Sequence, residues 1–205
     1  MIKTAISLFI IWILLLLTPG PDFVLILRNT INKGLKEGIL TNIGISLGLT
    51  IHTTAAILGI VVLSENPTLF NTVKIIGAIY LIYIGTSGFL NMKKSTLNLE
   101  AKDSKSSNSI REGFFCNILN PKLPLILLGV FTQLIPLNTP LWIKFLYGLE
   151  IIVASFLMWN LVALLFGNRK VLPQLKRFQK EIVILANTVL VFLGSYEILT
   201  FLQRR

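Results

Sequence analysis

The sequence predicts an all-α membrane protein with six transmembrane helices, arranged as two inverted three-helix repeats whose first helices are broken. Three observations support this fold class: the composition, six apolar stretches of spanning length, and paired proline interruptions. Of the 205 residues, 54% are hydrophobic and only 14% are charged, and the mean hydropathy is +0.77. Because soluble domains average about 25% charged residues, lipid is expected to be the main solvent of this chain.

Six stretches are long enough to cross a bilayer, which takes about 20 mostly apolar residues. The first of them could pass for a signal peptide, but it leads into Pro19 without a small-x-small cleavage site. We therefore interpret it as a retained span. The six expected spans are 4–27, 38–63, 69–92, 112–135, 142–166 and 182–203.

The basic residues alternate between the two sides of the predicted membrane. The first, third and fifth connections carry three, five and five Lys or Arg residues. The opposite side has only Lys3, Lys144, Arg204 and Arg205, with Lys74 one turn inside a span. Since connections rich in Lys and Arg face the cytoplasm, we expect the odd connections there and both termini outside. Anionic lipids are the expected partners of the basic loops.

A polar segment divides the chain into two halves of three spans each. Residues 93–111 are rich in Ser, Asn and Lys and are typical of a flexible linker. They separate a first three-helix repeat, 1–92, from a second, 112–205. Because three crossings change the side of the membrane, the second half must enter from the opposite face. Repeats related in this way are inverted, an architecture common among secondary transporters.

Prolines interrupt the first span of each half at corresponding positions. Proline removes a backbone donor and clashes with the preceding helical turn. Interrupted spans at matching positions of two halves point to the binding site of a transporter. We therefore predict that the substrate is bound by the residues of the two interruptions: Pro19, Gly20, Pro21, Asp22, Asn120, Pro121 and Lys122.

Each interruption has the residues to start a new helix. Gly20 can serve as the N-cap and Pro21 as the first helical residue after the first interruption. Asn120 and Pro121 suit the same two positions in the second. The two new half-helices are expected to start at a similar depth, so that their positive ends converge on one pocket that suits a carboxylate.

The two interruptions carry opposite charges. Asp22 follows a helix start, where an acid suits the positive end of the helix dipole, so a purely structural reading stands beside a role with a substrate ammonium group or a proton. Lys122 stands at the unfavourable end of the dipole. Pairing with Asp22, direct contact with a substrate, and snorkelling to the cytoplasmic interface stay open for this lysine.

Small residues form a stripe along the second span. Gly44, Gly48, His52 and Gly59 follow one another at helical spacing. Such stripes let helices approach closely in lipid. His52 is the only histidine, and it is either a hydrogen-bonded structural residue or, with Asp22, a member of a proton relay.

Polar side chains also occur within or near other spans. Lys74 and Glu150 fall near the outer interface, where snorkelling is the simplest interpretation. The remaining side chains either line a pathway or hydrogen-bond a neighbouring helix; they are Asn42, Asn117, Asn160, Asn187 and Glu197.

Several function classes are disfavoured by the residue inventory. The single cysteine, Cys116, excludes an intrachain disulfide or a cysteine metal site. One histidine and scattered acids cannot supply the ligands of a metal ion, and phosphate-binding loops and nucleophile elbows are absent. The formal net charge is +10, but no Arg-rich stripe with interleaved aromatics accompanies it, as nucleic-acid binding would require. We expect no enzymatic activity, cofactor, metal or nucleic-acid partner.

Four segments together resemble the LysE-type translocator family of lysine and RhtB-like amino-acid exporters. They are "TPGPD" in the first span, "GLKEGILTNIGISLGLTIH" with its spaced glycines, "GAIYLIYIGTSGF" in the third span and "REGFFCNILNPKLPLIL" in the fourth. The resemblance covers essentially the whole chain, in order and at normal length. On this sequence the marked positions of the family are Pro19 to Asp22 and Asn120 to Lys122.

The resemblance implies a multi-pass protein of the bacterial inner membrane that exports amino acids or close derivatives. It further implies that the proton gradient drives export. The oligomeric state stays open, a homo-oligomer included. The alternative is a membrane assembly or scaffold protein that transports nothing, in which the two interruptions only shape helix packing.

Overall fold

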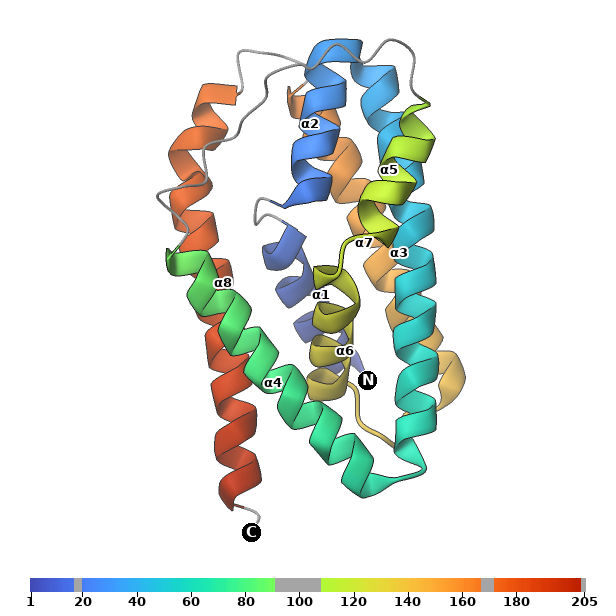
Figure 1. Cartoon of the computed structure of the whole chain (residues 1–205), viewed down its shortest axis with the longest axis vertical. Helices are drawn as coiled ribbons and strands as arrows, with labels where there is room; N and C mark the ends of the chain where they lie inside the picture. The colour runs from blue at the N-terminus through green and yellow to red at the C-terminus, as the bar shows by residue number, and fades with distance from the viewer. Residues whose placement is uncertain (17–19, 91–107, 167–171, 204–205) are drawn as a thin grey trace.

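The described part of the chain is entirely helical. A computed structural model describes residues 1–16, 20–90, 108–166 and 172–203, which form eight α-helices and no strand (Figure 1). This confirms the predicted all-α class, whereas residues 93–107 of the expected linker lie outside the described residues. The helices are α1 (Ile2–Leu16), α2 (Pro21–Lys33), α3 (Leu35–Ser64), α4 (Pro67–Leu90), α5 (Ser109–Ile118), α6 (Lys122–Leu134), α7 (Leu141–Phe166) and α8 (Leu172–Gln203).

The helices provide four to six candidate membrane spans. Helices α3, α4, α7 and α8 are each long and apolar enough to cross a membrane alone. The other four form two bent pairs, with 59° between α1 and α2 and 58° between α5 and α6. The two bent pairs fall where the sequence predicts a broken first and a broken fourth span. Counting each pair as one span gives six, and the chain is a membrane protein.

The outer surface of the helices is apolar. Large hydrophobic side chains such as Val62, Tyr83 and Leu157 are more than 60% exposed. So many exposed hydrophobic side chains would favour association in water. Helices that are apolar on all sides are instead expected in a membrane, so we expect these side chains to face lipid.

Helices α3 and α5 pack closely through glycine. A methyl group added at Gly44 would collide with the backbone of α5 at Ile110, and one added at Gly48 would come within 2.7 Å of Asn117 Oδ1. Gly59 lies on the same predicted stripe but has no atom within 4 Å of such a methyl group. The predicted close packing is therefore confirmed at Gly44 and Gly48 but is wrong for Gly59.

Helices α4 and α8 form a second close pair and cross at one side of the molecule (Figure 1). Lys74 Nζ of α4 lies 2.6 Å from Glu197 Oε1 of α8, and both side chains are mostly buried. A methyl group at Gly88 would collide with the Asn187 side chain, so small residues also bring this pair together. Lys74 thus has a protein partner where the sequence predicts snorkelling.

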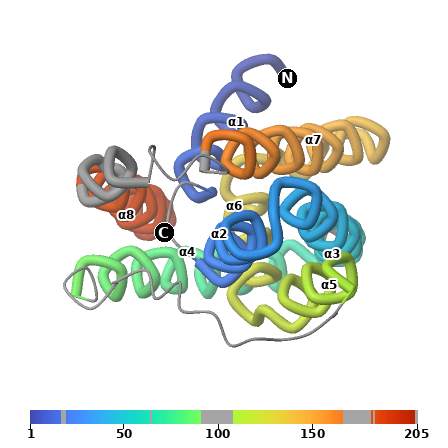
Figure 2. Tube along the Cα trace, turned by 90° about the horizontal axis from the view of Figure 1, so that it is seen from above, coloured from blue at the N-terminus to red at the C-terminus, as the bar shows by residue number. Residues whose placement is uncertain are grey.

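The half-helices that follow the two breaks occupy the interior of the bundle. In the view down the long axis, α2 and α6 lie near the centre, with α3, α4, α7 and α8 around them (Figure 2). Seen from the side, α2 and α6 run in opposite directions, and the ends at which they start are the ends nearest each other (Figure 1). This arrangement directs two helix N-termini towards the same region.

Candidate binding site at the two helix breaks

The first break starts α2 as its residues require. Gly20 is the N-cap, with an extended backbone (φ −141°, ψ −180°), and Pro21 is the first helical residue. Asp22 therefore lies in the first turn of α2, close to the free N–H groups of the helix start. The predicted roles of Gly20 and Pro21 are confirmed, whereas Pro19 lies outside the described residues.

The second break starts α6 one residue later than predicted. Pro121 is the N-cap and Lys122 the first helical residue, where the sequence predicts Asn120 and Pro121. Asn120 nevertheless caps this end, because its Oδ1 accepts a hydrogen bond from the Lys122 backbone N–H at 3.1 Å. The Lys122 side chain consequently projects from the first turn of α6.

One cavity is lined by residues of both breaks. Gly20, Pro21 and Asp22 line it from the first break, and Asn120 and Lys122 from the second. The cavity is small, with a volume of about 70 Å³. The rest of its wall is apolar and consists of Trp12, Leu15, Leu16, Phe23, Leu123, Ile126 and Trp159.

The Asp22 carboxylate is buried and hydrogen-bonded on one side. Asp22 is only 8% exposed, and its Oδ2 accepts a hydrogen bond from Asn117 Nδ2 of α5 at 2.7 Å. The other oxygen, Oδ1, accepts no hydrogen bond within the described part of the chain. The Cys116 thiol lies beside the same carboxylate, but a thiol is a weak donor. Asp22 therefore keeps an acceptor for a further donor.

His52 contacts Asn117, the residue whose side chain binds the Asp22 carboxylate. The imidazole Nε2 of His52 lies 3.2 Å from the backbone oxygen of Asn117, a distance at which the ring N–H donates to the carbonyl. The contacts of Asp22, Asn117 and His52 thus join α2, α5 and α3. The sequence analysis gave Asn117 no specific role and grouped it with the other polar side chains within or near the spans. It lies 95 residues from Asp22, so no local spacing could reveal the contact.

Lys122 lines the same cavity without being paired to Asp22. Three ion pairs are found among the described residues, and none of them includes Lys122 or Asp22. The pairing that the sequence left open for these two residues is therefore not formed, because Asp22 is turned towards Asn117 instead. Asp22 and Lys122 both line the cavity, as charged side chains that do not form an ion pair with each other.

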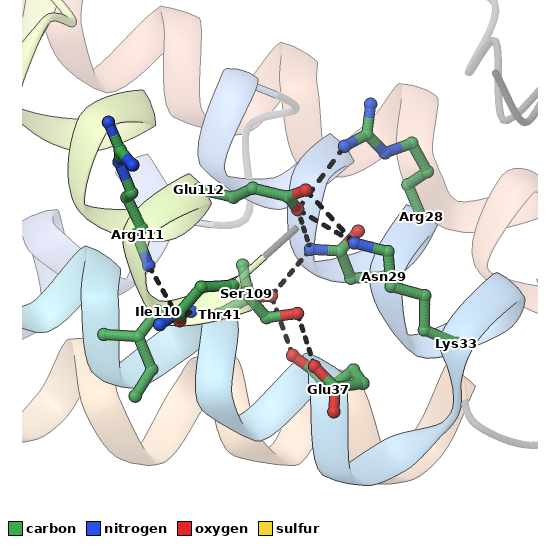
Figure 3. A network of polar contacts seen from close by, with 10 residues as sticks. Arg28, Asn29, Lys33, Glu37, Thr41, Ser109, Ile110, Arg111 and Glu112 are labelled. Carbon is green, nitrogen blue, oxygen red and sulfur yellow. Dashed lines mark hydrogen bonds and ion pairs between the residues drawn. The ribbon is translucent and has the colours of Figure 1, made fainter. Parts of the chain in front are cut away.

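A polar cluster joins the C-terminal part of α2 to α3 and α5 (Figure 3). We call it the Glu112 cluster: Arg28, Asn29, Lys33, Thr41 and Glu112. The Glu112 carboxylate, in the first turn of α5, accepts from Asn29 Nδ2 at 2.8 Å and from Lys33 Nζ at 3.1 Å, and Arg28 Nη2 lies 3.7 Å away. Asn29 Nδ2 also lies 2.8 Å from Thr41 Oγ1 of α3. Nothing in the spacing of the sequence predicted this cluster.

A second polar contact joins the starts of α3 and α5. Ser109 Oγ donates to Glu37 Oε2 at 2.5 Å (Figure 3). Asn108 caps α5, with its Oδ1 accepting from the Ile110 N–H at 3.0 Å. These contacts fix the first turn of α5 and, through it, the position of Glu112.

The groups that line the cavity can bind a small molecule reversibly. Within the described residues, no group of three or more His, Cys, Asp or Glu side chains is placed to hold a metal ion. The cavity instead offers one anionic group, one cationic group and two helix N-termini. Such a set can bind a small molecule that carries both charges, and it can bind or release a proton at Asp22.

Comparison with known proteins finds similar membrane and efflux proteins. An uncharacterized membrane protein, YrhP, of Bacillus subtilis is 30% identical over 88% of this chain and 91% of its own length. A leucine efflux protein of Klebsiella pneumoniae is 27% identical over 93% of this chain and 92% of its own. A threonine efflux protein of Escherichia coli K12 is 26% identical over 86% of both chains.

The match extends over the spans that carry both breaks. No solved structure matches this chain. The model of one family, described as LysE type translocator, matches residues 13–200, which include α2, α6 and every residue placed at the cavity apart from Trp12. The chain therefore belongs to the LysE type translocator family.

Proposed function

We propose that this chain is a secondary transporter that exports amino acids or close derivatives across the bacterial cell membrane. Family membership and the efflux proteins among the relatives support this proposal. The observation that carries it is the cavity between the two breaks, in which Asp22 and Lys122 offer opposite charges that do not pair with each other.

In the proposed complex, a zwitterionic amino acid binds between the two breaks. Its carboxylate lies near Lys122 and the N-termini of α2 and α6, which favour an anion. Its ammonium group donates to Asp22, whose Oδ1 has acceptor capacity to spare. Gly20, Pro21, Asn120 and Pro121 belong to the site as the residues that start the two helices, and we propose the same for Pro19.

The proposed architecture has two inverted repeats, 1–92 and 112–205, joined by the linker 93–111. The nearly equal bends of 59° and 58° support it. So do several contacts between the halves. Two pairs of counterparts are in contact, α3 with α7 and α4 with α8, and the contact of α1 with α6 has its equivalent in that of α5 with α2. A two-fold axis between the halves would produce such matched contacts.

The proposed orientation follows the basic residues of the connections. It puts the linker in the cytoplasm and both termini outside, with anionic lipids at the basic loops. The substrate then enters the cavity from the cytoplasm and leaves on the outer side.

We propose that a proton on Asp22 couples transport to the proton gradient. Protonation removes the negative charge that holds the ammonium group, so that proton binding and amino-acid binding compete. His52 is one contact away through Asn117 and is the candidate second member of a relay.

The test is export from proteoliposomes that contain the purified full-length chain and are loaded with labelled amino acids. The wild type should export at a rate that responds to an imposed pH gradient. Asp22→Asn should keep the fold but lose export or its response to the gradient. Glu65→Gln, which changes an exposed acid at the end of α3, is the matched control and should export normally.

Two outcomes would contradict this proposal. Normal proton-driven export by Asp22→Asn would leave Asp22 as a helix-start residue only. A folded wild type that exports none of the twenty amino acids would favour the membrane assembly or scaffold protein.

A further inference from the structure

The apolar wall of the cavity stands directly beside its charged end. Phe23 follows Asp22 in α2, and its ring meets Trp159 of α7 edge to face, with centroids 5.9 Å apart and planes inclined by 61°. Trp12 of α1 and Ile126 of α6 complete the wall from two further helices. All four side chains are nearly fully buried, at 2–4% exposure, so they form a fixed surface rather than a mobile rim.

Two polar atoms around this wall are already hydrogen-bonded. Trp12 carries one polar atom, Nε1, and this atom donates to Ser155 Oγ at 2.7 Å. Trp12 therefore presents only its ring carbons to the cavity. Asn120 Oδ1 accepts from the Lys122 backbone N–H. The lining side-chain groups left to bind a ligand are the Asp22 carboxylate, the Lys122 ammonium, the Asn120 amide N–H groups and the Trp159 indole N–H, so Asp22 and Lys122 are the only charged groups among the lining residues.

An amino acid can bind to these groups through its α-carboxylate and its α-ammonium. The α-carboxylate takes Lys122 and the α-ammonium takes Asp22. A third charge on the substrate would then lie against Phe23 and Trp159 with no counter-charge among the lining residues. Burial of an unpaired charge in apolar surroundings is strongly unfavourable, whereas an apolar side chain gains by contact with the same rings.

We infer that this site selects amino acids with a bulky apolar side chain and rejects those with a charged side chain. This inference rests on the proposed amino-acid export and names the class of substrate at that same cavity. The apolar wall of Trp12, Phe23, Ile126 and Trp159 holds the side chain, and Asp22 and Lys122 hold the α-groups.

Competition in proteoliposomes tests the inference on the wild-type chain. Vesicles are loaded with labelled leucine plus one unlabelled amino acid, and initial export is measured. Phenylalanine and methionine should compete about as well as leucine, and alanine should need about tenfold higher concentration, because missing methylene groups in an apolar pocket cost that much or more. Lysine and glutamate should compete weakly or not at all. Lysine or glutamate competing as well as leucine overturns the inference.

Variants of Trp159 test the residue that forms the wall. Trp159→Ala should reduce the preference for leucine over alanine about tenfold, while Trp159→Phe should largely keep it. Trp142→Ala is the matched control, since Trp142 lies on the same helix but is 62% exposed. An unchanged preference in a folded Trp159→Ala protein contradicts the assignment of this wall. If that variant does not fold, the competition series on the wild type still decides.

Different results would refute the inferred selectivity and the proposed export function. Export of lysine, glutamate or small polar amino acids in preference to leucine refutes the selectivity and leaves amino-acid export standing. Absence of export for every amino acid refutes both.

Discussion

Two lysines inside the spans illustrate how differently a buried charge can be held. Lys74 is paired with Glu197 across α4 and α8 at 2.6 Å. Lys122 lines the cavity and has no ion pair among the described residues. From the sequence, snorkelling to the membrane interface was a possible interpretation of both lysines. The difference lies in which helix packs against each lysine, and this depends on residues more than a hundred positions away from Lys74.

Neutralising each lysine should therefore have opposite effects. Lys74→Gln strands the Glu197 carboxylate and should lower the free energy of unfolding by about 3 kcal/mol, whereas Lys122→Gln strands no carboxylate and should leave stability unchanged or higher. Export should show the reverse, with a raised KM in Lys122→Gln only. Thermal unfolding in detergent and export kinetics measure the two effects. Equal loss of stability in both variants would show that Lys122 has a structural partner.

At the scale of helices, starts were easier to predict than contacts. The start of α2 at Pro21 was predicted from capping residues and prolines, which act within a few positions, and α6 starts at Lys122, one residue after the predicted position. The Asp22–Asn117 hydrogen bond and the Glu112 cluster link residues 95 and 83 positions apart. Such contacts depend on how helices pack, and one sequence carries no local signal for that.

Glycines of α3 provide a direct test of the packing between α3 and α5. A methyl group at Gly44 would meet backbone atoms of α5, which cannot rotate away as a side chain can. Gly44→Ala should thus lower the free energy of unfolding by about 1–3 kcal/mol through overpacking. Gly59→Ala, in the same helix with open space around it, should be neutral or stabilising by up to about 1 kcal/mol. Thermal unfolding of the two variants decides, and equal stability would contradict the close contact.

For the whole molecule, composition and apolar stretches predicted the class and the number of candidate spans. All six expected spans have counterparts, although α8 begins at Leu172, ten positions before the expected start. The sequence could not fix that start because the segment before 182 is polar and basic, and helix formation there does not depend on apolar length. The inverted relation of the halves and the sidedness of the chain stay predictions.

The sidedness prediction is tested by thiol labelling in a Cys116→Ala background. Ser104→Cys, outside the described residues, should react with an impermeant reagent only after the cells are opened. Gln203→Cys, at the end of α8, should react in intact cells. The reverse pattern would place the thirteen basic residues of the odd connections outside and refute the orientation.

The contacts of α2 with α5 have a mechanical consequence. These half-helices belong to different halves of the chain, and they are fastened at two places: Asp22 to Asn117 at one end, and Asn29 and Lys33 to Glu112 at the other. Because α2 and α5 are joined by hydrogen bonds near both of their ends, we expect them to move together. A change of the bend at one break should then also change the bend at the other. A ligand that draws Asp22 away from Asn117 would break the hydrogen bond at one end of the pair. The hydrogen bonds to the Glu112 carboxylate would still join the two helices at the other end.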